Sequence, residues 1–329
     1  MTQHKHFKAL VRARMARTGE RYAIARRHLT ASAGVVRLEP LSAIRAHPKH
    51  AIAVAFTPDG RELLSGGFGG EAKIWSPTDG EQLGELDGHT ASVNGFAFTP
   101  DGDRAVTVSS DATVRVWDLA SRRERTTIRG HARGAVAVDV AADGAIVTGG
   151  YDGTVRRWST EGDELARVKT GARAVALAAH PFDASVVVSP AEAQVHVLDA
   201  SGATVRTLAA HDVVSSVRWS ADGASLVAGT CRGVEVWTAD TWERVRTIPL
   251  AEDGATVVPV APSPDGALLA VGWAHHVGLW RADADEPAVT VDGLPKGVYG
   301  VAFSPDASTL AACGADGVVR VWAVVRDAM

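Results

Sequence analysis

The amino-acid sequence predicts an all-β fold, and three features carry that prediction. A short motif that ends in tryptophan recurs about every 40 residues through most of the chain. Within the units, an alternating apolar run leads into a Pro-Asp-Gly or similar turn, as at residues 53–60, 95–102 and 137–144. Seven units can be counted, and three or four strands per unit are typical of a propeller. We therefore predict a seven-bladed β-propeller that carries an N-terminal α-helical hairpin as an extension.

The units of the predicted propeller are evenly spaced along residues 31–329. Their closing positions are separated by 39 to 43 residues, and leucine replaces tryptophan in the fourth unit. Alternating apolar residues bounded by Pro, Asp and Gly indicate strands that are joined by tight turns. The closing positions are Trp75, Trp117, Trp158, Leu198, Trp237, Trp280 and Trp322.

The last unit ends too soon after Trp322 to hold a complete outer strand. Residues 35–47 align with the segments that end the outer strands of other units, at 124–131 and 205–211. We expect residues 35–47 to close the last blade, because such a closure removes two sheet edges that would otherwise be exposed.

Two dipeptides connect this period to a known family. Gly-His occurs at 88–89 and 130–131, and Trp-Asp occurs at 117–118. With these motifs, residues 31–329 resemble the WD-repeat family of β-propellers. The resemblance implies a tetrad of His, Ser or Thr, Asp and Trp in each blade, in which buried ring N–H groups find hydrogen-bond partners. Two units have the full set, namely His89, Thr107, Asp111 and Trp117, then His131, Thr148, Asp152 and Trp158.

Several units depart from the tetrad pattern. The first unit has Gly69 where the family has aspartate, the fifth has Cys231 and the sixth has Ala274. The fourth unit lacks the tryptophan. The first unit keeps the other three members, which are His47, Ser65 and Trp75.

The resemblance implies that partners bind the wide top face, around the central channel. Residues that precede the tetrad aspartate position and residues that start the inner strands face that surface, and several are aromatic. Exposed aromatic rings beside arginine are typical of protein-interaction hot spots; alternatively, some of these rings plug the channel. The predicted partner-binding residues are His50, Phe68, Ser92, Asn94, Tyr151, Arg173, Trp273 and Tyr299.

Charged residues of both signs enter the inner strands near this face. If the basic ones cluster, an acidic or phosphorylated peptide would suit them, because both carry acceptor oxygens for charged donors. The basic residues are Lys49, Arg133, Lys169, Arg173 and Lys296, and the acidic ones are Asp212, Glu252 and Asp253.

Motifs for catalysis are missing from the sequence. It contains no nucleophile elbow, phosphate-binding loop or dinucleotide fingerprint in a suitable setting, and the inner strands offer almost no titratable groups. His50 is expected at the top rim. His275 and His276 are neighbours that point to opposite faces, whereas a transition metal needs three or four convergent ligands. We predict no catalytic residue, metal or cofactor.

The chain has two cysteines, Cys231 and Cys313, which exclude a disulfide framework. Arg232 beside Cys231 would favour a reactive thiolate, although a small residue in a degenerate turn is the simpler interpretation. No apolar stretch has the length of a signal-peptide core or of a transmembrane helix. We expect a soluble, cytoplasmic protein without a membrane contact.

The N-terminal segment differs from the rest in charge. Residues 1–30 carry a net charge of +7, so the remainder carries −11 to give the total of −4. Apolar residues from Phe7 to Met15 follow a helical period, Gly19 ends that helix, and Glu20 opens a second one. We predict a basic helical hairpin, docking through Phe7, Arg12, Arg14, Arg17, Arg21 and Arg26.

Three roles for this hairpin stay open. It resembles short helical leaders of bacterial domains, which implies a docking tag for another protein. It would also pack against the acidic propeller, or bind nucleic acid or another polyanion, since clustered cations bind phosphates.

These observations predict a non-enzymatic interaction scaffold or adaptor. One protein or peptide would bind the top face and a second would contact the N-terminal helices. The alternatives are an enzyme with a small-molecule site at the central channel and a nucleic-acid-linked regulator that uses the hairpin.

Overall fold

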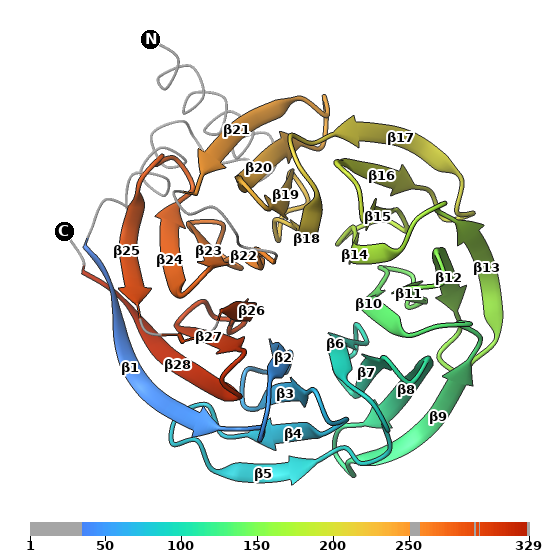
Figure 1. Ribbon diagram of the computed structural model, residues 1–329, viewed down its shortest axis with the longest axis horizontal. Helices are drawn as coiled ribbons and strands as arrows, with labels where there is room; N and C mark the ends of the chain where they lie inside the picture. The colour runs from blue at the N-terminus through green and yellow to red at the C-terminus, as the bar shows by residue number, and fades with distance from the viewer. Residues whose placement is uncertain (1–34, 251–256, 293, 296, 328–329) are drawn as a thin grey trace.

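Four-stranded antiparallel sheets repeat around a central axis in the computed structural model (Figure 1). The structure describes residues 35–250, 257–292, 294–295 and 297–327, and these ranges form seven such sheets. The prediction of an all-β, seven-bladed propeller is therefore confirmed. The predicted N-terminal hairpin, with its docking residues, lies outside the described residues.

Each blade follows chain order from the channel outward. Blade 1 holds β2 (Ala51–Phe56), β3 (Leu63–Gly67), β4 (Ala72–Trp75) and β5 (Gln82–Glu85). Blade 2 holds β6 (Val93–Phe98), β7 (Arg104–Ser109), β8 (Thr113–Asp118) and β9 (Arg123–Arg129). Blade 3 holds β10 (Ala135–Val140), β11 (Ile146–Gly150), β12 (Thr154–Trp158) and β13 (Glu164–Lys169). Blade 4 holds β14 (Ala174–Ala179), β15 (Val186–Pro190), β16 (Gln194–Leu198) and β17 (Thr204–Ala209).

The remaining blades follow the same order. Blade 5 holds β18 (Val214–Trp219), β19 (Ser225–Thr230), β20 (Gly233–Thr238) and β21 (Arg244–Pro249). Blade 6 holds β22 (Val260–Pro262), β23 (Leu268–Trp273), β24 (His276–Arg281) and β25 (Pro287–Asp292). Blade 7 holds β26 (Val298–Phe303), β27 (Thr309–Gly314) and β28 (Val318–Arg326), and its fourth strand is β1 (Val36–Arg45).

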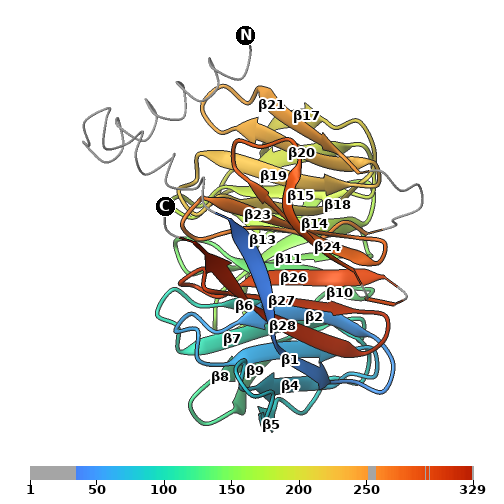
Figure 2. The same cartoon turned by 90° about the vertical axis from the view of Figure 1, so that its left-hand side faces the viewer.

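Blade 7 joins the two ends of the described chain. The pairing of β1 with β28 is antiparallel and runs from Val36 opposite Arg326 to Arg45 opposite Val318. Figure 2 shows β1, in blue, lying along the red β28. The strand closure expected for this segment is present, and it covers the edge that β28 would otherwise expose.

Apolar contacts between neighbouring blades form the core. Where blades 7 and 1 meet, Ile44 and Val319 pack in one buried cluster with Phe56 and Trp75. Burial of one such side chain contributes roughly 1.5–3 kcal/mol. Each blade therefore depends on its two neighbours for much of its stability.

The Pro-Asp-Gly sequences form the turns between the first two strands of a blade. In blade 1, Thr57 Oγ1 donates to the Asp59 carboxylate at 2.6 Å, and Asp59 accepts the Arg61 N–H at 3.0 Å. These bonds lower the pKa of Asp59. Gly60 has a φ of 73°, a conformation that glycine adopts at little cost.

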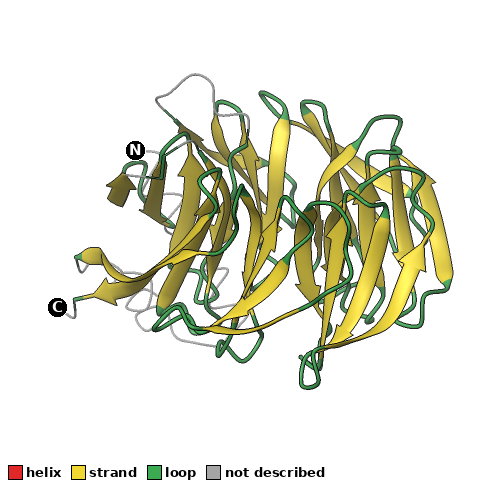
Figure 3. Ribbon diagram, turned by 60° about the horizontal axis from the view of Figure 1, so that its bottom comes forward, coloured by secondary structure: helices red, strands yellow, loops and turns green. Residues whose placement is uncertain are grey.

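The strands run between two faces of the disc, and loops lie on both faces (Figure 3). We define the top face by the loops that lead from an outer strand to the next inner strand and by the turns between the second and third strands. The opposite face is the bottom face. Because neighbouring strands are antiparallel, these two kinds of loop necessarily share one face.

The blade 2 tetrad is fully formed. His89 Nε2 lies 2.7 Å from Thr107 Oγ1, and Trp117 Nε1 donates to the same oxygen at 2.9 Å. His89 Nδ1 lies 3.0 Å from the Asp111 carboxylate, which also accepts the Thr90 N–H at 3.0 Å. Asp111 therefore ties the loop that carries Thr90 to the turn between β7 and β8, and so fixes two top-face loops together.

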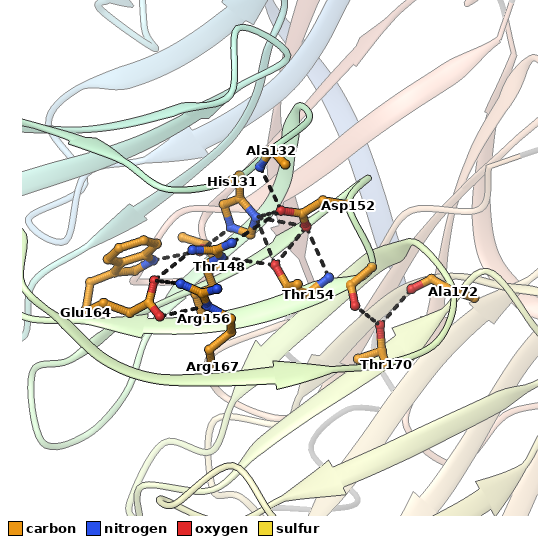
Figure 4. Close-up of polar contacts among 12 residues, drawn as sticks. His131, Ala132, Thr148, Asp152, Thr154, Arg156, Glu164, Arg167, Thr170 and Ala172 are labelled. Atoms are coloured by element: carbon orange, nitrogen blue, oxygen red, sulfur yellow. Dashed lines mark hydrogen bonds and ion pairs between the residues drawn. The ribbon is translucent and has the colours of Figure 1, made fainter.

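Blade 3 repeats this arrangement (Figure 4). His131 bonds to Thr148 at 2.8 Å and to Asp152 at 3.1 Å, and Trp158 Nε1 donates to Thr148 at 2.8 Å. Asp152 also accepts the Ala132 N–H at 2.9 Å. Burial lowers the pKa of both tetrad histidines, so these rings are neutral in the fold near pH 7.

Blade 1 forms only part of the tetrad hydrogen-bond network. His47 and Trp75 share Ser65 Oγ, each at 2.8 Å, but His47 Nδ1 is buried and has no hydrogen-bond partner. The Glu71 carboxylate fills the space that an aspartate at position 69 would take, but its Oε2 stays 3.8 Å from His47 Nδ1. Burial, the largest cause, lowers the pKa of His47 to about 4.

We predict that the double variant Gly69→Asp/Glu71→Thr stabilises blade 1 in mild acid. With a folded-state pKa of about 4, His47 stays neutral while the unfolded chain binds a proton below pH 6.5. The free energy of unfolding thus falls by about 3 kcal/mol between pH 6.5 and pH 4. A carboxylate on Nδ1 raises this pKa, so urea unfolding at pH 7 and pH 5 should show a smaller loss.

Glu71→Thr alone is the control for that experiment. It removes the nearby carboxylate without supplying a new one, so it should lose as much stability between pH 7 and pH 5 as the parent chain, because His47 is already neutral at pH 5 in the parent. A double variant that loses as much stability as the parent chain would contradict this account.

Candidate functional site

One group of the predicted partner-binding residues lies where blades 7 and 1 meet on the top face. The His50 ring is 5.6 Å from the Phe68 ring and 5.9 Å from the Tyr299 ring, between ring centres. His50 Nδ1 bonds to the Ala315 carbonyl oxygen at 2.8 Å, which connects the two blades. Phe68 remains 48% exposed, and Lys49 Nζ lies 5.8 Å from the centre of its ring.

A second group lies where blades 3 and 4 meet. The Arg173 guanidinium carbon is 5.7 Å from the centre of the Tyr151 ring, which is 36% exposed. The Tyr151 N–H donates to the Gly134 carbonyl oxygen at 2.9 Å. This bond fixes Tyr151 beside the loop that carries Arg133.

Ser92 and Asn94 of blade 2 connect the two groups. Ser92 Oγ donates to the Phe68 carbonyl oxygen at 3.0 Å. Asn94 Nδ2 donates to Ser110 Oγ at 3.0 Å and to the Ala135 carbonyl oxygen at 2.8 Å. Both residues therefore use their donors to join neighbouring blades, and they support the surface while the rings and cations stay accessible.

We call the resulting continuous surface the top-face arc. Contacts link it from blade 7 through blades 1, 2 and 3 to blade 4. It contains seven of the eight predicted partner-binding residues together with two cations, and its members are Lys49, His50, Phe68, Ser92, Asn94, Arg133, Tyr151, Arg173 and Tyr299.

Trp273 does not belong to this surface, and its prediction as a solvent-facing residue is wrong. It is only 8% exposed, and its ring packs 5.4 Å from Trp280 and 5.2 Å from His276. The reason is turn length: only Ala274 and His275 separate β23 from β24, whereas three residues separate β11 from β12. Trp273 is therefore the last residue of its strand and corresponds to Gly150.

Charge on the top face is distributed unevenly. Lys49, Arg133 and Arg173 are exposed, and none of them has an ion-pair partner within the part of the chain that the structure describes. In blade 5, by contrast, Arg232 Nε lies 3.1 Å from the Asp212 carboxylate. Lys169 is also exposed at the top end of β13, whereas Lys296, Glu252 and Asp253 lie outside the described residues.

The inner strands surround a central channel of about 560 Å³. Most of the residues that line it are apolar, but Asp139 and Arg218 contribute charged groups that were not predicted from the sequence. The signal was available, because alanine stands at the same inner-strand position in the other five blades. Those alanines are Ala55, Ala97, Ala178, Ala261 and Ala302.

The Asp139 carboxylate is held by hydrogen bonds from two backbone N–H groups. It accepts the N–H of Ala179 on the neighbouring inner strand at 2.9 Å and that of Val140 at 2.8 Å. Burial raises the pKa of Asp139, although these N–H groups and the charge of Arg218 act in the opposite direction. Asp139 thus joins blades 3 and 4 at the channel wall.

The histidine pair of blade 6 does not converge. His276 Nδ1 lies 2.6 Å from the Asp292 carboxylate, whereas His275 is exposed in the turn. Within the described ranges, no cluster of three or more His, Cys, Asp or Glu side chains is suited to a metal ion.

Cys231 is not activated by Arg232. Partial burial, followed by the charge of Asp212, raises the pKa of the Cys231 thiol, and Arg232 pairs with Asp212 instead. The structure therefore favours the simpler interpretation of Cys231, a small residue in a degenerate turn. Cys313 is fully buried, and burial raises its pKa as well.

Comparison with protein families agrees with this geometry. The model described as WD domain, G-beta repeat matches residues 38–76, 80–118, 122–159, 202–238 and 286–323, which together make up more than half of the chain. The chain belongs to the WD40 family. No curated protein matches it.

The segments that the family model leaves unmatched include the repeats of blades 4 and 6, which depart from the family motif. Residues 160–201 and 239–285 are not matched. The first range holds the third strand of blade 4, which ends in Leu198 instead of tryptophan, and the second holds the shortened turn of blade 6. WD40 propellers are typically non-enzymatic scaffolds that bind proteins or peptides. In the described part of this chain, no helix has the length and apolar character needed to cross a bilayer.

We predict that Cys231 reacts slowly with iodoacetamide at pH 7. Its raised pKa leaves less thiolate than a free cysteine has, so carbamidomethylation followed by mass spectrometry should be slower than for N-acetylcysteine. Asp212→Asn removes the repelling charge and frees Arg232, so it should increase the rate. Asp240→Asn, in a bottom-face turn, is the matched control. A parent rate above that of N-acetylcysteine would contradict the assignment.

Proposed function

We propose that this WD40 propeller is a non-enzymatic interaction scaffold that binds a protein segment on the top-face arc. One observation carries the proposal: two exposed aromatic rings, Phe68 and Tyr151, each lie beside an unpaired cation. Aromatic and arginine side chains contribute most of the binding energy in typical interfaces.

The support beneath these rings favours the same function. Phe68 and Tyr151 stand in turns that are bonded to neighbouring loops through backbone N–H groups, which donate to His50 and Gly134. Asp152 further fixes the turn that follows Tyr151. A surface that is already ordered loses less conformational entropy when a partner binds.

The channel supports catalysis less well than the arc supports binding. Both carboxylate oxygens of Asp139 accept backbone N–H groups, and Arg218 donates to the carbonyl oxygen of its neighbour Val217 at 2.9 Å. These groups have partners within the protein, so their arrangement favours a structural role over acid–base chemistry.

The second contact of the proposed adaptor is the N-terminal segment. Its net charge of +7 contrasts with −11 for the rest of the chain. We assign it a separate partner from that of the top face, with a protein as the preferred partner and a polyanion such as nucleic acid as the alternative.

We predict that the top-face and N-terminal contacts recover different proteins from native lysate. The baits are the full chain, a chain lacking residues 1–30, and the double variant Phe68→Ala/Tyr151→Ala. Loss of one hot-spot ring costs about 2 kcal/mol, so the double variant should lose its partner about 30-fold or more. Mass spectrometry identifies and quantifies the recovered proteins.

The matched control is Phe182→Ala. Phe182 is 68% exposed in the bottom-face loop between β14 and β15, so its loss should not affect a top-face partner. If the double variant and the truncation recover the same proteins as the full chain, the adaptor function is refuted.

A further inference from the structure

We infer that the top-face arc selects an acidic peptide segment. The acidic side chains of that segment would face Lys49, Arg133 and Arg173, and an apolar side chain would rest against Phe68 and Tyr299. This inference depends on the proposed function, because it names the chemistry of the partner that the same surface binds.

The availability of the three cations is the first argument. All three are exposed, and within the described ranges none has a carboxylate within ion-pair distance. Several other arginines of the propeller are paired: Arg156 lies 2.7 Å from Glu164, and Arg244 lies 2.7 Å from Glu235. Unpaired cations on one face attract a chain of opposite charge and increase its association rate.

The position of two of these cations over aromatic rings is the second argument. Lys49 and Arg173 lie 5.8 and 5.7 Å from the ring centres of Phe68 and Tyr151. The ring face attracts the cation and orients it without neutralising its charge. The N–H groups of both side chains therefore stay free to donate to a carboxylate, and an Arg–carboxylate bond of this kind is among the stronger hydrogen bonds in proteins.

The limits of the arc are the third argument. Beyond Arg173, the turn after β15 carries Glu192, which accepts a hydrogen bond from Gln194. In blade 5, Arg232 and Asp212 neutralise each other. The unpaired cations of the arc thus lie from the start of blade 1 to the start of blade 4, whereas blade 5 offers a neutral ion pair, and this favours a position over blades 1 to 4 for an acidic segment.

The apolar part of the partner follows from the rings at blades 7 and 1. The His50 ring contacts the Phe68 ring and the Tyr299 ring edge to face, and Tyr299 also lines the channel. An aliphatic or aromatic side chain that covers Phe68 removes apolar area from water, at roughly 25 cal/mol for each Å². Acidic residues that flank one apolar residue are therefore the expected sequence pattern.

The test is selection of peptides from a random phage-displayed library on the full chain. We expect the enriched peptides to carry several Asp or Glu residues around an apolar residue. One enriched peptide, labelled with fluorescein, is then titrated in an anisotropy assay against the parent chain and its variants.

Arg133→Gln/Arg173→Gln should weaken binding about tenfold or more and reduce its dependence on salt. Arg123→Gln, on the outer strand β9, is the matched control for charge, and Phe182→Ala is the control for an exposed ring. Both controls should bind like the parent chain. A version of the peptide with Asp and Glu replaced by Asn and Gln should bind the parent chain at least as weakly as the acidic peptide binds the double variant, because Lys49 remains in that variant.

The outcomes separate the inference from the proposed function. Enrichment of neutral or basic peptides whose binding still requires Phe68 and Tyr151 overturns the acidic preference and leaves the top-face function standing. Peptides that bind all variants equally overturn both. A selection that enriches no peptide overturns the inference, and the lysate experiment then decides the proposed function.

Discussion

The pairing of β1 with β28 is the constraint on which the rest of the propeller depends. Each blade buries its apolar faces only against its two neighbours, so an open ring would leave two faces in water. The cluster of Ile44, Phe56 and Val319 shows what the closure achieves, because it unites strands from both ends of the chain in one core. A ring that is closed in this way holds its top-face loops at fixed positions around the channel.

Carboxylates that bind backbone N–H groups transmit this rigidity to the top face. Asp111 and Asp152 each connect a loop between blades with a turn inside a blade. Blade 5 reaches the same result differently: its buried Glu235, on the third strand, accepts the His211 N–H at 2.8 Å and pairs with Arg244. In blade 2, Arg115 stands at the position of Glu235 and Glu124 at the position of Arg244. The two blades therefore form an ion pair at the same place with the positive and negative residues exchanged.

Much of the fold could be predicted from the sequence because the same local motif recurs at a nearly constant spacing, which gives the size and the number of the blades. The tryptophan spacing and the Pro-Asp-Gly turns are local signals, and the position of residues 35–47 followed from a missing strand. Trp273 was misplaced because Ala274 was assigned to the tetrad aspartate position. The turn of blade 6 has one residue fewer than that of blade 3, and this moves the Trp273 side chain from the surface into the core. Glu71 was missed for another reason: whether it replaces an absent aspartate depends on side-chain geometry that no spacing encodes.

The candidate surface and the intact tetrads occur in the same part of the ring, and this has a physical reason. A side chain on a loop that is already ordered costs less conformational entropy when a partner binds. Tyr151 is followed directly by the tetrad Asp152, and Ser92 and Asn94 bond to the blades on either side. In blade 6 the position next to the turn holds Trp273, which packs inward and stabilises the blade. The turns between the second and third strands thus differ from blade to blade: in blade 3 the turn holds an exposed ring, Tyr151, over an intact tetrad, whereas in blade 6 a buried ring stands beside a shorter turn.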